Sequence, residues 1–218
     1  MAEIQIRKLA PDQELRVPAA LWSAATFTAL DSWSQLVERI YGYRVHRFAA
    51  VDGKETVGIL ALAHIHHPTS PYGSFGGFAF SSIQARDALL QQAQTLANEL
   101  DVEYTAIRFI EDGNTPPAPW IQNPAYATYL IDLPSNPEDL MKSLGSQQRK
   151  HTRQSLRRGF NIQFGHLDLL DETYAALSQS MHELGSPYHS KRYLREMAAL
   201  LGDQQIGRAS CRERVLWR

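Results

Sequence analysis

Two apolar-rich runs, residues 44–51 and 55–65, lie on either side of the dipeptide Asp52-Gly53. This dipeptide between two strand-like runs is a strong signal for a tight hairpin turn, because both residues tolerate positive φ. A hairpin joins antiparallel strands, whereas a doubly wound fold is built from parallel strands joined by crossover helices. The sequence therefore predicts an antiparallel pair in its first half and excludes a doubly wound sheet.

The segments around this hairpin alternate between strand and helix patterns. Residues 4–9 alternate apolar and polar side chains as a strand does, and Asp31-Ser32 precedes a helical pattern that Gly42 ends. Residues 84–100 are amphipathic with helical spacing, and residues 104–110 and 125–133 are typical of strands. This order predicts an α+β fold (mixed α/β) in which helices flank a mixed, mostly antiparallel sheet.

A second set of elements begins after residue 135. Asn136 and Pro137, followed by two acids, are typical of a helix N-terminus, and a basic helical stretch extends from there to Arg158. A strand over residues 160–164 and helices over residues 173–184 and 192–201 follow. We predict a first domain over residues 1–158, including this basic connecting helix, and the start of a second, truncated domain over residues 159–205.

The last residues, 206–218, differ from the rest of the chain. Four arginines and one glutamate fall in the final twelve residues, without an apolar period or a helix cap. The segment resembles an adaptor-derived reading frame, so we expect a foreign or disordered tail and assign no role to Cys211. The alternative is a basic tail that binds an acidic partner.

Composition excludes several classes of protein. The 218 residues are 44% hydrophobic and carry a formal net charge of -1, which is ordinary for a globular protein and argues against general nucleic-acid binding. No run of about 18 apolar residues is present, and the N-terminus lacks the pattern of a signal peptide. The single cysteine excludes an internal disulfide and favours a cytoplasmic location. We expect no metal site, because no metal-binding motif is present.

A glycine-rich loop spans residues 71–78 and contains three glycines within five positions. Glycines allow the backbone to approach a ligand or another chain closely. The loop is neither a Walker loop, which requires a following Gly-Lys-Ser/Thr, nor a dinucleotide fingerprint, which opens directly into a helix. The alternative is a tight bend between strands that is anchored by aromatic residues.

A basic run extends from Lys142 to Arg158, and no acidic residue occurs between Asp139 and Asp168. On a helix, Arg149, Arg153 and Arg157 share one face, where like charges at this spacing repel. A phosphate or diphosphate would compensate them, because guanidinium groups bind phosphate oxygens in a bidentate manner. The alternative is a solvated basic face with acidic partners within the protein.

A third group, His182, Ser186 and Tyr188, surrounds the turn Leu184-Gly185-Ser186-Pro187. These side chains could line a pocket, but a capping glycine followed by proline is the simpler interpretation. The sequence contains no nucleophile–base pair and no Gly-x-Ser-x-Gly elbow, so the catalytic residues are unknown.

Taken in order, these motifs resemble the FemAB-related (Fem-type) family, whose members have GNAT-like acyltransferase folds. The resemblance extends from Ile4 to about Gln204. It rests on Ser32-Trp33, Tyr41-Gly42, Val57-Gly58-Ile59-Leu60, Tyr72 to Phe78, Ala125-Tyr126-Ala127-Thr128, Asp132-Leu133-Pro134, Arg149 to Gly159, and His182-Glu183-Leu184-Gly185-Ser186-Pro187.

The resemblance implies a pair of GNAT-like units, of which the second is only begun in this chain. It also implies transfer of an acyl or aminoacyl group to an amine of a cell-wall (peptidoglycan) or exopolysaccharide-related precursor. The donor would be acyl-CoA or aminoacyl-tRNA, with no permanently bound cofactor. Basic residues would grip the precursor's diphosphate, and the implied substrate-binding residues are Trp33, Tyr72, Phe75, Arg149, Lys150 and Arg153.

The implied partners are an anionic small-molecule or lipid-linked precursor, near a membrane surface, and aminoacyl-tRNA. Because the second unit is expected to be truncated, we expect this polypeptide to be inactive on its own. Two alternatives remain open. One is a non-catalytic module that binds a phosphorylated glycan or nucleotide-sugar, and the other is a small-molecule acyl-CoA N-acyltransferase.

Overall fold

The computed structural model describes residues 4–10, 13, 18, 21, 27–65, 77–108, 115–123, 133–158, 162–186, 188–201, 208–211 and 214–216. The chain divides into two compact units, Met1–Ala125 and Tyr126–Arg218. The basic connecting segment thus groups with the second unit. The functional domain boundary at residue 158 stays a prediction.

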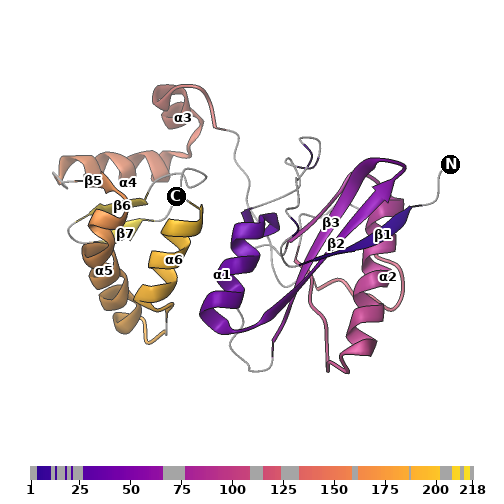
Figure 1. The fold of residues 1–218 in the computed structure, drawn as a ribbon. Coiled ribbons are helices and arrows are strands. Elements are labelled where there is room, and N and C mark those ends of the chain that lie inside the picture. The colour runs from indigo at the N-terminus through magenta and orange to yellow at the C-terminus, as the bar shows by residue number, and fades with distance from the viewer. Residues whose placement is uncertain are drawn as a thin grey trace. The chain divides into compact units, whose positions relative to one another are not determined.

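The first unit is built on a four-stranded antiparallel sheet of order β1-β2-β3-β4. Two helices, α1 and α2, lie on opposite faces of this sheet (Figure 1). The elements are β1 (Gln5–Leu9), a 3-10 turn at Phe27–Ala29, α1 (Asp31–Tyr41), β2 (Arg44–Asp52), β3 (Glu55–His64), β4 (Gly77–Phe80) and α2 (Ile83–Glu99). This architecture confirms the predicted α+β fold with a mostly antiparallel sheet.

The predicted hairpin is present as β2 and β3. Asp52 pairs with Glu55, so the two turn residues are Gly53 and Lys54, and Gly53 has a φ of 60° that favours glycine. The turn therefore lies one residue later than Asp52-Gly53 predicted. The alternating pattern of the two strands also sets their register, because every second side chain faces the same helix.

The main core lies between the sheet and α2. Ser82 caps α2, since its hydroxyl accepts the Ala85 N–H at 3.2 Å, and the apolar face of the helix then covers the strands. The apolar side chains on one face of the sheet therefore pack against the apolar face of α2 in one cluster that excludes water. The buried residues of this cluster are Phe48, Ala50, Leu60, Phe78, Ala85, Leu89, Leu90, Ala93 and Leu96.

Three sequence predictions for the first unit need correction. Asp31 begins α1 but does not cap it, because its carboxylate pairs with Arg47 and the N-cap position is Leu30. Residues 77–80 form strand β4, which was not predicted because residues 71–78 have the composition of a glycine-rich loop.

The described part of the predicted strand 104–110, residues 104–108, forms no strand. Ile107 packs on the core but does not pair with another strand. Residues 124–132, with most of the predicted strand 125–133, lie outside the described residues.

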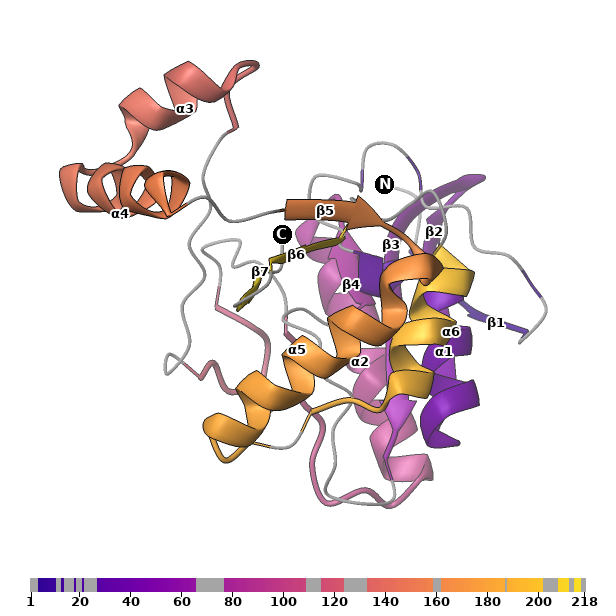
Figure 2. The ribbon, with the colours of Figure 1, turned by 90° about the vertical axis from the view of Figure 1, so that its left-hand side faces the viewer.

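The described residues of the second unit form two pairs of helices and three strands. α3 (Pro137–Ser143) and α4 (Ser146–Arg157) form the first pair, and α5 (Leu170–Glu183) and α6 (Lys191–Leu201) form the second (Figure 2). Between the pairs lie β5 (Ile162–Gly165) and a 3-10 turn at Leu167–Leu169. The basic stretch that the sequence predicted to be one helical region is divided at Leu144 and Gly145, where the backbone becomes extended.

The second and third strands of this sheet, whose order is β5-β6-β7, come from residues 208–216. β6 (Arg208–Cys211) pairs with β5, and β7 (Arg214–Leu216) pairs with β6, both antiparallel. These strands lie in residues 206–218, which the sequence predicts to be a foreign or disordered tail. The foreign origin of that segment stays a prediction.

Candidate anion-binding groove

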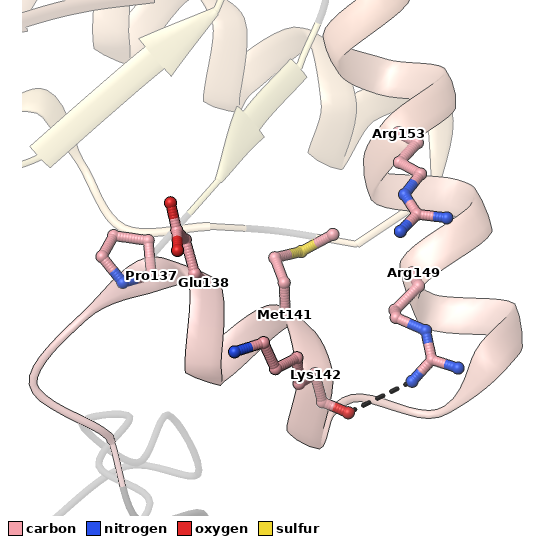
Figure 3. Close-up of a pocket in the computed structure, with 6 residues that line it drawn as sticks. All are labelled: Pro137, Glu138, Met141, Lys142, Arg149 and Arg153. Carbon is pink, nitrogen blue, oxygen red and sulfur yellow. Dashed lines mark hydrogen bonds between the residues drawn. The ribbon is translucent and has the colours of Figure 1, made fainter.

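An open groove of about 670 Å³ lies between α3 and α4, within the second unit. Four of its lining residues come from α3 and two from α4, as Figure 3 shows. In that view the Arg149 guanidinium reaches toward the end of α3, and the Arg153 side chain lies one turn further along α4. The lining residues are Pro137, Glu138, Met141, Lys142, Arg149 and Arg153.

Helix α3, which is started by a cap at Asn136, forms one wall of the groove. The Asn136 side chain caps α3 by accepting the Asp139 N–H at 2.8 Å, and Pro137 occupies the first helical turn. A helix that starts at residue 137 places Glu138, Met141 and Lys142 on one face, because residues three and four apart are neighbours. That face is the one that lines the groove.

Asp139 and Lys142 form an ion pair at the rim. The Lys142 ammonium lies 2.8 Å from the Asp139 carboxylate, and both side chains are exposed. The hydrogen bond from Lys142, together with one from Asn136, lowers the pKa of Asp139. Lys142 is therefore partly compensated, and Glu138 brings a carboxylate to the groove itself. The predicted alternative of acidic partners within the protein accordingly holds for part of the basic run.

Arg149 reaches back from the first turns of α4 to the end of α3. Its Nη1 donates a hydrogen bond to the Lys142 carbonyl oxygen at 3.2 Å and another to the carbonyl oxygen of Leu144 (Figure 3). The side chain is half-buried, unlike the other arginines of the helix. One nitrogen of this guanidinium is thus already committed to backbone oxygens.

Arg153 is the more available of the two groove arginines. It lies one helical turn after Arg149, is exposed, and makes no hydrogen bond or ion pair with the part of the chain that the structure describes. Lys150 is also exposed, but it does not line the groove. Arg149 and Arg153 therefore both line the groove, whereas Lys150 does not, and binding roles for these three residues stay predictions.

The remaining predicted site residues belong to the first unit. Trp33 lies in α1 and is only 8% exposed, so its indole is largely a core group. Tyr72 and Phe75 lie outside the described residues, as does most of the glycine-rich loop. Binding roles for these three residues stay predictions.

Four groove residues were not singled out as site residues from the sequence: Pro137, Glu138, Met141 and Lys142. Their spacing is the signal that could have identified them, since they follow a predicted N-cap at helical intervals. α3 and α4 face each other because the helix is interrupted at Leu144-Gly145. The sequence analysis predicted one helical region across these two residues.

The turn after α5, around which His182, Ser186 and Tyr188 were considered as pocket residues, is a helix cap. Gly185 has a φ of 65°, its N–H donates to the His182 carbonyl oxygen, and the Ser186 N–H donates to that of Met181. This double hydrogen bond is a Schellman motif, which satisfies the last carbonyl groups of α5. The preferred interpretation, a capping glycine, is confirmed.

The groove is suited to bind an anion that is exposed to water. Cations line it from both helices beside the Glu138 carboxylate, and guanidinium and ammonium groups both bind phosphate. Within the described residues, no group of three or more histidine, cysteine or acidic side chains could hold a metal ion. The described helices also include none that is long and apolar enough to cross a membrane.

Comparisons with known proteins support the fold. No protein-family model and no curated protein sequence matches the chain. Among solved structures, the crystal structure of FemX superposes with a TM-score of 0.61 at 16% sequence identity, covering 88% of this chain and 55% of the FemX chain. The chain thus spans about half the length of FemX. The likeness shows that the chain has a GNAT-like α+β fold, and at the level of fold it supports the resemblance to Fem-type proteins.

Proposed function

We propose that this chain is part of a Fem-type acyltransferase, which transfers an acyl or aminoacyl group to an amine of a cell-wall or exopolysaccharide-related precursor. In this proposal the groove between α3 and α4 binds the phosphate or diphosphate of that precursor. The observation that carries it is the convergence of Arg149, Arg153 and Lys142 on one open groove. The fold shared with FemX gives this groove an acyltransferase context.

The proposed reaction needs alignment more than special side-chain chemistry. The acceptor amine attacks the acyl carbon and forms a C–N bond, and the bond from that carbon to the CoA sulfur or to the tRNA ribose oxygen breaks. The sulfur or oxygen leaves with the bonding electrons and takes up the proton that the amine releases, directly or through water. Holding the two substrates in line supplies much of the rate enhancement, and hydrogen-bond donors stabilise the developing oxyanion. The donor enters as a substrate, without a resident cofactor, and we propose a cytoplasmic location where both donors are available.

A binding module for a phosphorylated glycan or nucleotide-sugar is the second candidate. Every lining residue of the groove comes from α3 or α4, which are adjacent in the sequence. The groove therefore needs neither the first unit nor a longer second unit in order to bind an anion. This candidate shares the ligand with the transferase proposal but not the acyl donor.

The first experiment measures affinity for inorganic pyrophosphate and for a UDP-sugar by isothermal titration calorimetry. We expect Arg153→Ala to weaken binding by about tenfold, because one charge-assisted hydrogen bond is lost. Arg157→Ala is the matched control, since Arg157 is exposed on the same helix but does not line the groove. Equal loss in both variants, or no binding by the unmodified chain, would contradict the proposed site.

The second experiment separates the two candidate functions. Labelled acyl-CoA and aminoacyl-tRNA are offered with an amine acceptor to a version of the protein that carries two complete GNAT-like units, as the Fem-type proposal requires. Transfer from aminoacyl-tRNA supports the Fem-type proposal, and transfer from acyl-CoA to small amines alone identifies an acyl-CoA N-acyltransferase. Pyrophosphate binding without transfer from either donor identifies a binding module. The 218-residue chain itself is expected to be inactive in this assay.

A further inference from the structure

The C-terminal end of α3 lacks the usual closing turn. The last carbonyl groups of a helix have no partner within the helix and need other donors. Leu144, which follows α3, is extended (φ −69°, ψ 146°), so no glycine in the left-handed region closes this end. The Leu140 oxygen accepts the Leu144 N–H at 3.2 Å and the Ser143 hydroxyl at 2.8 Å. The Lys142 and Leu144 oxygens therefore depend on another donor.

Arg149 is that donor, and its place in the sequence explains why. Its Nη1 donates to the Lys142 oxygen at 3.2 Å and also to the Leu144 oxygen. The residue lies near the start of α4, where its charge is unfavourable for its own helix dipole, but its side chain reaches the negative end of α3. Only Leu144 and Gly145 separate the two helices, so this contact ties the end of one to the beginning of the other.

We propose that Arg149 is a positioning residue of the groove, whereas Arg153 is the arginine that contacts the anion. By holding the end of α3 against α4, Arg149 fixes where Lys142 and Arg153 stand relative to each other. Neither helix has a buried residue among its described positions, so core packing does not do this. The ligand in this inference rests on the proposed function, but the contact of Arg149 with α3 does not.

The test compares the variants Arg149→Ala, Arg149→Lys and Arg153→Ala in the full chain with two measurements. Hydrogen exchange of the α3 amides is followed by NMR without ligand, and affinity for inorganic pyrophosphate is measured separately. We expect Arg149→Ala to lower α3 protection by about fivefold, as for loss of a typical hydrogen bond, and to weaken pyrophosphate binding as well. Arg153→Ala should weaken binding and leave α3 protection unchanged.

Arg149→Lys adds a readout that separates positioning from direct contact. A lysine keeps the charge, but it lacks the planar fork, so it should restore α3 protection only in part. For a positioning residue, affinity should recover in proportion to protection. Lost affinity in Arg149→Ala with unchanged α3 protection would overturn the proposal, and so would variants of Arg149 that change neither quantity. If the unmodified chain fails to bind pyrophosphate, the proposed function fails, and the exchange data still decide whether Arg149 holds α3.

Discussion

Arg47 in β2 forms a buried ion pair with Asp31, the first residue of α1. The two side chains are 7% and 15% exposed, and Nη2 of Arg47 also donates to the carbonyl oxygen of Ala10. The pair thus links a helix to the sheet face that it covers. Because a buried charge needs a partner, removal of one member is far more costly than removal of both.

We therefore expect Arg47→Met to lower the free energy of unfolding of the first unit by about 3 kcal/mol or more. The loss should be much smaller in the double variant Asp31→Asn, Arg47→Met, which leaves no buried charge unpaired. Urea unfolding followed by amide signals of β2 and β3 gives both values. Equal destabilisation by the single and double variants would show that the pair contributes by shape and not by charge.

His46 should make the stability of the first unit sensitive to mild acid. The imidazole is buried, and its Nε2 has no hydrogen-bond partner among the described residues. Burial lowers the pKa of His46 below its ordinary value of 6.5, and Lys8, Arg44 and His64 lower it further, whereas Glu38 opposes them. The ring centre of His64 lies 6.5 Å away.

A lowered pKa in the folded state means that the unfolded chain binds the proton first as pH falls. Stability is therefore complete above pH 6.5 and declines below it, by at most about 1.4 kcal/mol per pH unit, until the folded pKa is passed. His46→Gln should flatten this decline below pH 6.5. His151→Gln, at an exposed position of α4, is the control. An unchanged pH profile in His46→Gln would contradict the assignment.

Two buried glycines of the sheet should differ in their tolerance of alanine. A Cβ at Gly77 would lie 2.7 Å from the backbone oxygen of Thr28, whereas one at Gly58 would first meet the end of the Leu89 side chain at 2.9 Å. Backbone cannot move as cheaply as a side-chain end, so we expect Gly77→Ala to cost about 1–3 kcal/mol and Gly58→Ala less. Thermal unfolding of both variants checks this order, and the reverse order would contradict it.

Much of the first unit could be predicted from local sequence patterns. The hairpin of β2 and β3, the helix ended by Gly42 and the amphipathic α2 each carry their own turn or cap signals. Strand β4 could not be recognised in this way, because four residues beginning with Gly77 carry no period. Its glycine is explained by close packing on the Thr28 backbone, which is a tertiary contact.

The candidate groove was predictable only in part. The four-residue spacing of Arg149 and Arg153 placed both on one helical face, and they do line the groove together. The sequence could not show that α3 turns back at Leu144-Gly145, because that turn is held by a side chain from the following helix. It also could not show that Asp139 compensates Lys142.

The most direct test of the account is an NMR map of where pyrophosphate binds on the intact chain. We predict saturable shifts for the amide signals of Lys142, Arg149 and Arg153, with smaller shifts for Lys150 and Arg157. Shifts that grow linearly at every exposed basic residue, or that saturate in another part of the chain, would contradict the claim that the groove between α3 and α4 is an anion site.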